Sequence, residues 1–162
     1  MTGESRTFRA RALAQAHPLS PEAHRYANEV VARERRSQPE PEIGLWAGYA
    51  LTNGYCLRRV EESEILDHTP SLVIGDPQEL EQRATEIAGR IRTSGAARLH
   101  LIPEEDIVAD LDDLIAGEID RRLADWRDAV STETWRQLEE YIAWWTIKGY
   151  ALRVAETTEV DT

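Results

Sequence analysis

Apolar side chains recur at helical spacing along most of the chain, and serine and proline stand where helices would begin. In segment 76–95 the apolar positions step by four, three and four, which places them on one helix face: Leu80, Ala84, Ile87 and Ile91. Segment 20–36 opens with Ser20 as an N-cap and Pro21 at the first helical position. Both segments predict amphipathic helices on the outside of a bundle.

The second half of the chain continues the pattern with two longer helices. Segment 103–130 has an apolar stripe that would face inward: Ile107, Leu111, Leu114, Ile115, Ile119, Leu123 and Trp126. Ser131 or Thr132 would cap the next helix, which we expect to run as far as Glu156. The prolines of segment 38–42 would end one helix and start another.

Extended structure is confined to short segments. Segment 97–102 has the composition of a strand, and segment 67–77 that of a loop or a short extended piece. One or two such pieces cannot form an independent sheet. The sequence therefore predicts an all-α fold, a single-domain bundle of about five helices over residues 20–157.

Two of these helices lack the charged face of an outer helix. Residues 43–57 contain no charged side chain, and residues 141–154 contain only Lys148 and Arg153. A helix that is apolar on all sides belongs in the middle of a bundle or in an oligomer interface. We therefore expect these two helices to form a central pair.

The two central segments also resemble each other. Residues 54–61, Gly-Tyr-Cys-Leu-Arg-Arg-Val-Glu, match residues 149–156, Gly-Tyr-Ala-Leu-Arg-Val-Ala-Glu, at five of eight positions and at an offset of 95 residues. A duplicated helix pair would explain the match, and so would the similar burial of two central helices. In the first segment Gly44 and Gly48, four positions apart, would let a neighbouring helix approach closely.

Charge and length restrict the classes of function. The chain has 162 residues and a net charge of −11, which argues against direct, non-specific nucleic-acid binding because phosphates demand a basic surface. No apolar run approaches the roughly 18–20 residues that span a bilayer. A single cysteine allows no internal disulfide, which suits the cytoplasm.

The two ends of the chain differ in charge from each other. Residues 1–36 hold seven arginines and four acidic residues. We expect residues 1–19 to form a flexible basic arm, with a mitochondrial presequence as the alternative, and residues 158–162 to form a disordered acidic tail.

Motifs of catalysis and metal binding are missing from the sequence. The histidines form no metal-ligand spacing, and no Glu-x-x-His, nucleophile elbow or phosphate-binding loop occurs. Four aspartates gather opposite the apolar stripe of segment 103–130: Asp106, Asp110, Asp113 and Asp120. We interpret them as a solvated face, or as a docking surface for a basic protein, and we assign no metal, cofactor or catalytic residue.

One face of the second central helix is a candidate interface. Trp145 lies on the apolar seam, whereas Trp144 lies about 100° around the helix. The face around Trp144 comprises Tyr141, Trp144, Lys148 and Ala151. It would pack within the bundle, form a homodimer interface or line a ligand pocket.

A pocket between the two central helices is the matching small-molecule hypothesis. Lys148 would be its reactive amine if burial lowered its pKa, or an ordinary ion-paired lysine. Arg58 and Arg153 would contact an anion there. The candidate ligand-binding residues are Trp46, Tyr49, Asn53, Tyr55, Arg58, Trp144, Lys148, Tyr150 and Arg153.

These features predict a small cytoplasmic accessory or regulatory protein, an adaptor, inhibitor or subunit. It would act through protein contacts as a homodimer, with the helices over 43–60 and 135–156 as its core. The alternative is a helical small-molecule binder or enzyme with an aromatic pocket around Lys148. A third interpretation, an acidic mimic of nucleic acid, requires a spacing of carboxylates that sequence does not reveal.

Overall fold

The computed structural model describes residues 5–16, 19–65, 77–93 and 99–157. Within these ranges it contains six α-helices and no β-strand, which confirms the all-α prediction. The helices are α1 (Arg6–Ala14), α2 (Pro21–Ser37), α3 (Pro41–Ile65), α4 (Pro77–Arg92), α5 (Glu104–Leu123) and α6 (Thr132–Thr157). The additional helix, compared with the five expected, is α1.

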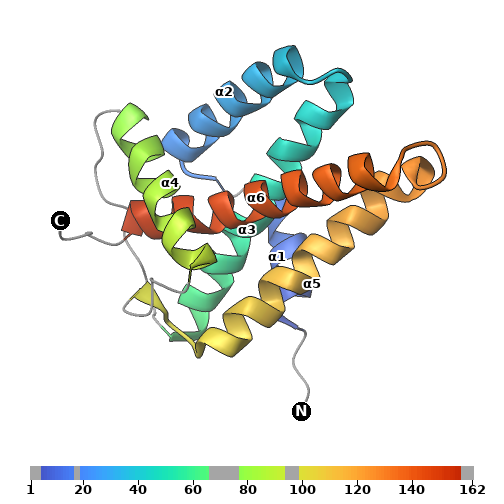
Figure 1. The fold of residues 1–162 in the computed structure, drawn as a ribbon. Helices are drawn as coiled ribbons and strands as arrows, with labels where there is room; N and C mark the ends of the chain where they lie inside the picture. Colours follow the sequence, from blue (N-terminus) through green and yellow to red (C-terminus); the bar gives the residue numbers. More distant parts are fainter. Residues whose placement is uncertain (1–4, 17–18, 66–76, 94–98, 158–162) are drawn as a thin grey trace.

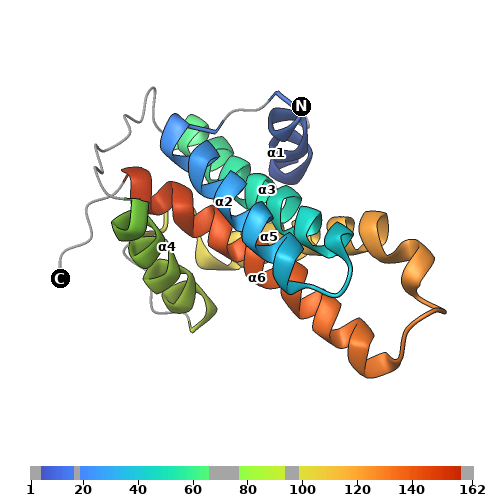
Figure 2. The same cartoon turned by 90° about the horizontal axis from the view of Figure 1, so that it is seen from above.

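The predicted central pair is confirmed. α3 and α6 cross in the middle of the bundle and make the most extensive contact between helices of the described ranges (Figure 1). α1 and α2 pack mainly against α3, whereas α4 and α5 pack mainly against α6 (Figure 2). Although α3 and α6 are largely apolar, no described helix is long and apolar enough to span a bilayer.

Polar side chains cap helices where the sequence predicts. Ser20 Oγ accepts a hydrogen bond from the Ala23 amide at 3.1 Å and so begins α2. Ser131, rather than Thr132, caps α6, because its Oγ accepts from the Thr134 amide at 3.1 Å. Both caps lie where the sequence places a helix start.

Two sequence predictions differ from the structure in extent. The helix expected over 103–130 is α5, which ends at Leu123 and is followed by a 3-10 helix, Ala124–Trp126. The described part of segment 97–102 contains no strand. Most of the predicted loop over 67–77 and the whole predicted tail 158–162 lie outside the described residues.

Glycines at equivalent positions bring α3 and α6 into backbone contact. A Cβ atom on Gly54 would lie 1.9 Å from the Thr146 carbonyl oxygen, and one on Gly149 would lie 1.9 Å from the Leu51 carbonyl oxygen. Leu51 and Thr146 are themselves 95 positions apart, so the offset that relates the two sequence segments also relates these contacts. A larger residue at either glycine would push the helices apart.

A second close approach joins α2 to α3. A Cβ atom on Gly44 would lie 2.5 Å from the Arg35 backbone nitrogen, and one on Gly48 would lie 2.6 Å from Val31 Cγ2. The predicted use of these two glycines is confirmed, with α2 as the neighbouring helix.

The segment expected to be a flexible arm contains α1, which docks on the acidic face of α5. Arg6 Nε donates to Asp110 Oδ2 at 2.6 Å, and the buried Thr7 donates from Oγ1 to Asp113 Oδ2 at 2.5 Å. The predicted solvated face of α5 is thus partly covered by a basic segment of the same chain. These contacts are polar, so the apolar periodicity that identifies amphipathic helices gives no sign of them.

We predict that Gly54→Ala destabilises the protein by about 3 kcal/mol, because the added methyl group overlaps a backbone oxygen that cannot rotate away. Gly89→Ala in α4 is the matched control. A Cβ atom there meets no atom within 4 Å, so better helix propensity should stabilise the protein by up to about 1 kcal/mol. Urea unfolding of both variants measures the difference, and equal effects would contradict the crossing as described.

Candidate functional site

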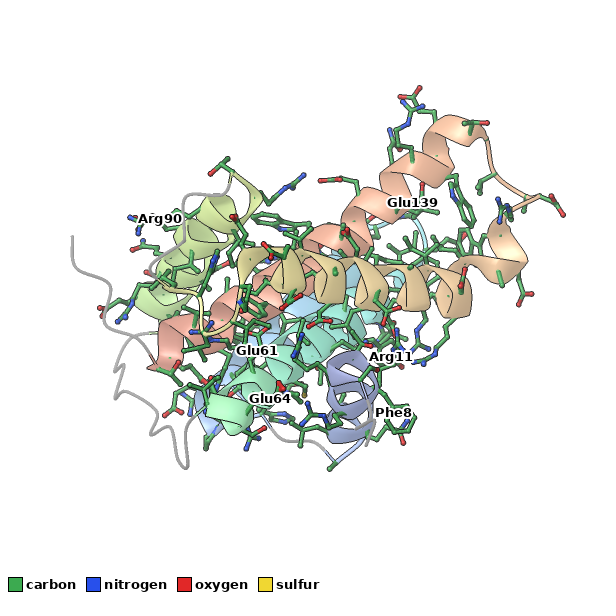
Figure 3. The ribbon with its side chains drawn as sticks, turned by 90° about the horizontal axis from the view of Figure 1, so that it is seen from below. Phe8, Arg11, Glu61, Glu64, Arg90 and Glu139 are labelled. Atoms are coloured by element: carbon green, nitrogen blue, oxygen red, sulfur yellow. The ribbon has the colours of Figure 1, made fainter. Side chains whose placement is uncertain are left out.

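A pocket of about 500 Å³ opens between α1, α2, α3 and α5. Its apolar wall comes from Leu19, Ala27, Val31 and Leu45. α1 contributes Arg11 to the rim. Figure 3 shows Arg11 on the side of α1 that faces α5, whereas Phe8 points away from the bundle. The pocket therefore depends on the docked position of α1.

A buried amide is the most informative polar group of the pocket. Asn53 on α3 lines the pocket and is only 6% exposed. Its side chain makes no hydrogen bond to any described residue, whereas the neighbouring Thr52 donates to the Gly48 carbonyl oxygen at 2.8 Å. The Asn53 amide atoms are not among the fully buried unpaired atoms of the described ranges, so they face the open space of the pocket rather than the closed core. Asn53 thus has both donor and acceptor capacity available at the pocket wall.

Arginines form the opposite side of the pocket around one buried carboxylate. Glu118 is 1% exposed and accepts from Arg122 Nε at 3.1 Å and from Arg121 Nη1 at 3.4 Å. The Arg122 guanidinium lies over the ring of Tyr49, 4.2 Å from its centroid. These contacts hold Arg122 in one orientation at the pocket.

The third arginine of the pocket, Arg11, reaches α5 at a glycine. Its Nη2 donates to the Asp113 carbonyl oxygen at 3.1 Å. A Cβ atom on Gly117 would lie 2.2 Å from the same nitrogen, so the arginine occupies the space that a side chain would fill. Arg11 Nε is buried and has no hydrogen-bond partner among the described residues.

Only part of the predicted pocket lies here. Of the nine candidate ligand-binding residues, Tyr49 and Asn53 line the pocket. Trp46 is buried against Trp126, with ring centroids 5.3 Å apart. The sequence analysis missed the arginine side, although the close spacing of Glu118, Arg121 and Arg122 was a visible signal.

Four other candidate residues form two equivalent clusters at the α3–α6 crossing. Tyr55 donates from its hydroxyl to Glu156 Oε1 at 2.5 Å, and Arg153 Nη1 donates to both, at 3.3 Å each. Under the 95-residue offset, Tyr150 donates to Glu61 Oε1 at 2.5 Å and accepts from Arg58 Nη1 at 3.1 Å. Each cluster joins one tyrosine to an arginine and a glutamate of the opposite helix.

The arginines of the two clusters already bond to tyrosine and glutamate side chains of the protein itself. All six members are buried, and Arg153 also donates to Glu62 from Nη2 at 2.9 Å. The arginines that we expected to meet an anionic ligand therefore meet glutamates of the chain. Among the described residues no group of three or more histidine, cysteine or acidic side chains is arranged to hold a metal ion.

Lys148 on α6 is not part of the pocket lining. It is 3% exposed, and its Nζ lies 5.4–5.7 Å from the ring centroids of Tyr26, Trp144 and Trp145. Burial lowers the pKa of its amine. The aromatic rings partly replace the lost hydration by cation–π attraction.

The face predicted as a homodimer interface packs within the chain. The Tyr141 hydroxyl donates to Glu34 Oε1 of α2 at 2.8 Å, and Arg92 of α4 lies over the ring of Trp144, 5.7 Å from its centroid. Ala151 is fully buried. These contacts match the first of the three alternatives, packing inside the bundle.

Glu61 makes stability depend on pH. Burial raises its pKa from 4.5 to about 7, against the opposing effects of Tyr150 and Arg58. The folded state thus binds this proton more tightly than the unfolded state, so its contribution to stability is present at low pH and is lost as pH rises from about 4.5 to 7. The charged form is the destabilising one.

We therefore compare the free energy of unfolding of Glu61→Gln with that of wild type. We predict that this difference shifts in favour of the variant by on the order of 2 kcal/mol from pH 4 to pH 8. Urea unfolding across this range tests it. Glu29→Gln, an exposed carboxylate of α2 that makes no ion pair among the described residues, is the control and should not reproduce the rise. A Glu61→Gln difference that is flat with pH would refute the raised pKa.

The single lysine permits a direct titration. We predict that the amine of Lys148 titrates below the ordinary lysine pKa of about 10.4, as measured by ¹³C NMR of the lysine Cε. Because Glu81 raises this pKa electrostatically, Glu81→Gln should lower it further, whereas Glu86→Gln, five residues further along α4, serves as the control. A pKa at or above the ordinary value would show that the aromatic rings outweigh desolvation.

Comparison with known proteins gives no assignment. No protein-family model matches the chain, and no curated protein and no solved structure matches it. A functional proposal therefore rests on the chain's own residues and their geometry.

Proposed function

We propose that the protein binds a small organic molecule in the pocket between α1, α2, α3 and α5. The observation that carries this proposal is Asn53, a buried amide without a hydrogen-bond partner among the described residues at the wall of the pocket. A bound ligand would supply the missing partner. The proposal keeps the small-molecule alternative of the sequence analysis but moves its site away from Lys148.

The size and composition of the pocket support binding. Ligand pockets typically measure about 300–1,000 Å³ and combine apolar walls with a few placed polar groups. This pocket, at about 500 Å³, lies in that range and joins an apolar wall to Asn53, Tyr49 and the arginines. Leu45, Tyr49 and Asn53 follow one another at intervals of four along α3, so one helix presents apolar, aromatic and amide groups to the same cavity.

The accessory role through protein contacts stays a prediction. Its expected interface residues Lys148 and Ala151 are buried within a single chain. The large apolar side chains that are exposed in the described ranges lie on three different helices: Phe8, Tyr49, Ile65 and Val108. No contact or patch among them favours a second function over ligand binding.

Asn53→Leu separates function from stability. Leucine keeps the branched shape of the side chain but removes its amide, so we predict that it stabilises the protein by about 1 kcal/mol and weakens ligand binding by about tenfold. Stability is measured by urea unfolding. Binding is measured by NMR with a library of neutral, anionic and cationic fragments, which should shift the Asn53 side-chain amide signals.

A second pair of variants locates the binding. Asn28→Trp places a large ring at the exposed rim of the pocket and should abolish fragment binding, whereas Glu29→Trp, the next residue of α2 and outside the pocket lining, should leave it intact. The proposal fails if no fragment binds, or if binding persists unchanged in Asn28→Trp.

A further inference from the structure

We infer that the ligand of this pocket is an organic anion whose carboxylate or phosphate oxygens pair with the guanidinium of Arg122. This inference rests on the proposed function and specifies its ligand class. Three observations carry it: the charge of the pocket, the fixed orientation of Arg122 and the arrangement of apolar and polar groups around the cavity.

The pocket is basic although the protein is acidic. Three arginines line it, Arg11, Arg121 and Arg122, and the acidic residue among them is Glu118. The chain as a whole carries a net charge of −11. A local excess of two positive charges, inside a concave surface of low polarity, favours an anionic occupant, because confined charges interact more strongly than exposed ones.

Arg122 is prepared for such an occupant. Its Nε is used by Glu118 and one face of its guanidinium by Tyr49, whereas its two terminal nitrogens donate to no described acceptor. Those nitrogens form the edge of a planar fork that matches two oxygens of a carboxylate or phosphate. Glu118, nearly fully buried, is a positioning residue, since it accepts from Arg122 Nε and so orients the fork.

Arg11 adds a second positive charge with unused hydrogen-bonding capacity. It makes no ion pair among the described residues, and its bond to Asp113 is to a backbone carbonyl oxygen. A neutral carbonyl leaves the positive charge of the guanidinium uncompensated. The electrostatic field at the pocket thus comes from two helices, α1 and α5.

The rest of the cavity limits the shape of the anion. Val31 and Leu45 give it an apolar wall, and Asn53 gives it one amide with donor and acceptor groups. An inorganic ion would leave this apolar surface uncovered. The expected ligand therefore has an apolar body, an anionic head at Arg122 and a polar group that reaches Asn53.

Pairs of molecules that differ only in charge test the inference. The probes are benzoate and benzamide, 1-naphthoate and 1-naphthamide, and indole-3-acetate and indole-3-acetamide, titrated by NMR at low ionic strength. We expect at least one carboxylate to bind about tenfold more tightly than its amide, and this preference to shrink as salt is added.

Variants assign the preference to Arg122. Arg122→Gln should reduce it to about twofold or less, and Arg122→Lys should keep only part of it because the planar fork is lost. Arg127→Gln is the matched control. Arg127 also lies over an aromatic ring, that of Trp135 at 5.5 Å, but away from the pocket lining, and its loss should leave the preference unchanged. Unfolding midpoints confirm that each variant is folded.

The outcomes separate the two proposals. Amides that bind as tightly as carboxylates, with binding lost in Asn28→Trp, would overturn the anion inference and leave the pocket standing. A carboxylate preference that survives Arg122→Gln would also overturn it. Binding by no fragment, or binding insensitive to Asn28→Trp, would overturn the proposed function and the inference together.

Discussion

The carbonyl oxygens of Leu51 and Thr146 each occupy the space that a Cβ atom would fill on the opposing glycine, so α3 and α6 touch backbone to backbone. This contact determines the rest of the bundle. Because the two axes are so close, Tyr55 and Tyr150 can each reach a glutamate on the other helix. The other helices then cover what the crossing leaves open, with α1 and α2 on α3, and α4 and α5 on α6 (Figures 1 and 2).

The charged groups at this crossing determine geometry more than they add stability. Removing carboxylates and guanidinium groups from water carries a penalty that their attraction only partly offsets, and an apolar replacement often gives an equally stable protein. Glu61 illustrates the penalty, because one of its oxygens is buried without a partner and burial raises the pKa of the side chain. Bonds between tyrosine, arginine and glutamate are directional, however, so they favour one register of α3 against α6 over neighbouring ones.

The sequence predicts the helices and their central pair because both depend on local signals. Serine caps, prolines and the absence of charge in residues 43–57 are visible without knowing any tertiary contact. The site depends on contacts between distant segments. Tyr49 and Asn53 could be selected because aromatic and amide groups are unusual in an apolar helix, but Arg11 could not, since α1 is held on α5 by polar contacts that leave no periodic pattern. Similarly, the sequence shows the charge of Arg153 but not its partner Glu62, which lies on the other central helix.

The docking of α1 has a consequence for the energetics of the N-terminal segment. This nine-residue helix is too short to be stable alone in water, so its contacts with α3 and α5 must stabilise it. α1 also carries Arg11 into the pocket. A ligand that contacts Arg11 would therefore strengthen the packing of α1 on the bundle, and the packing of α1 would strengthen ligand binding by the same free energy. Protease resistance of the first helix would then report how full the pocket is, even when the bundle around α3 and α6 stays intact.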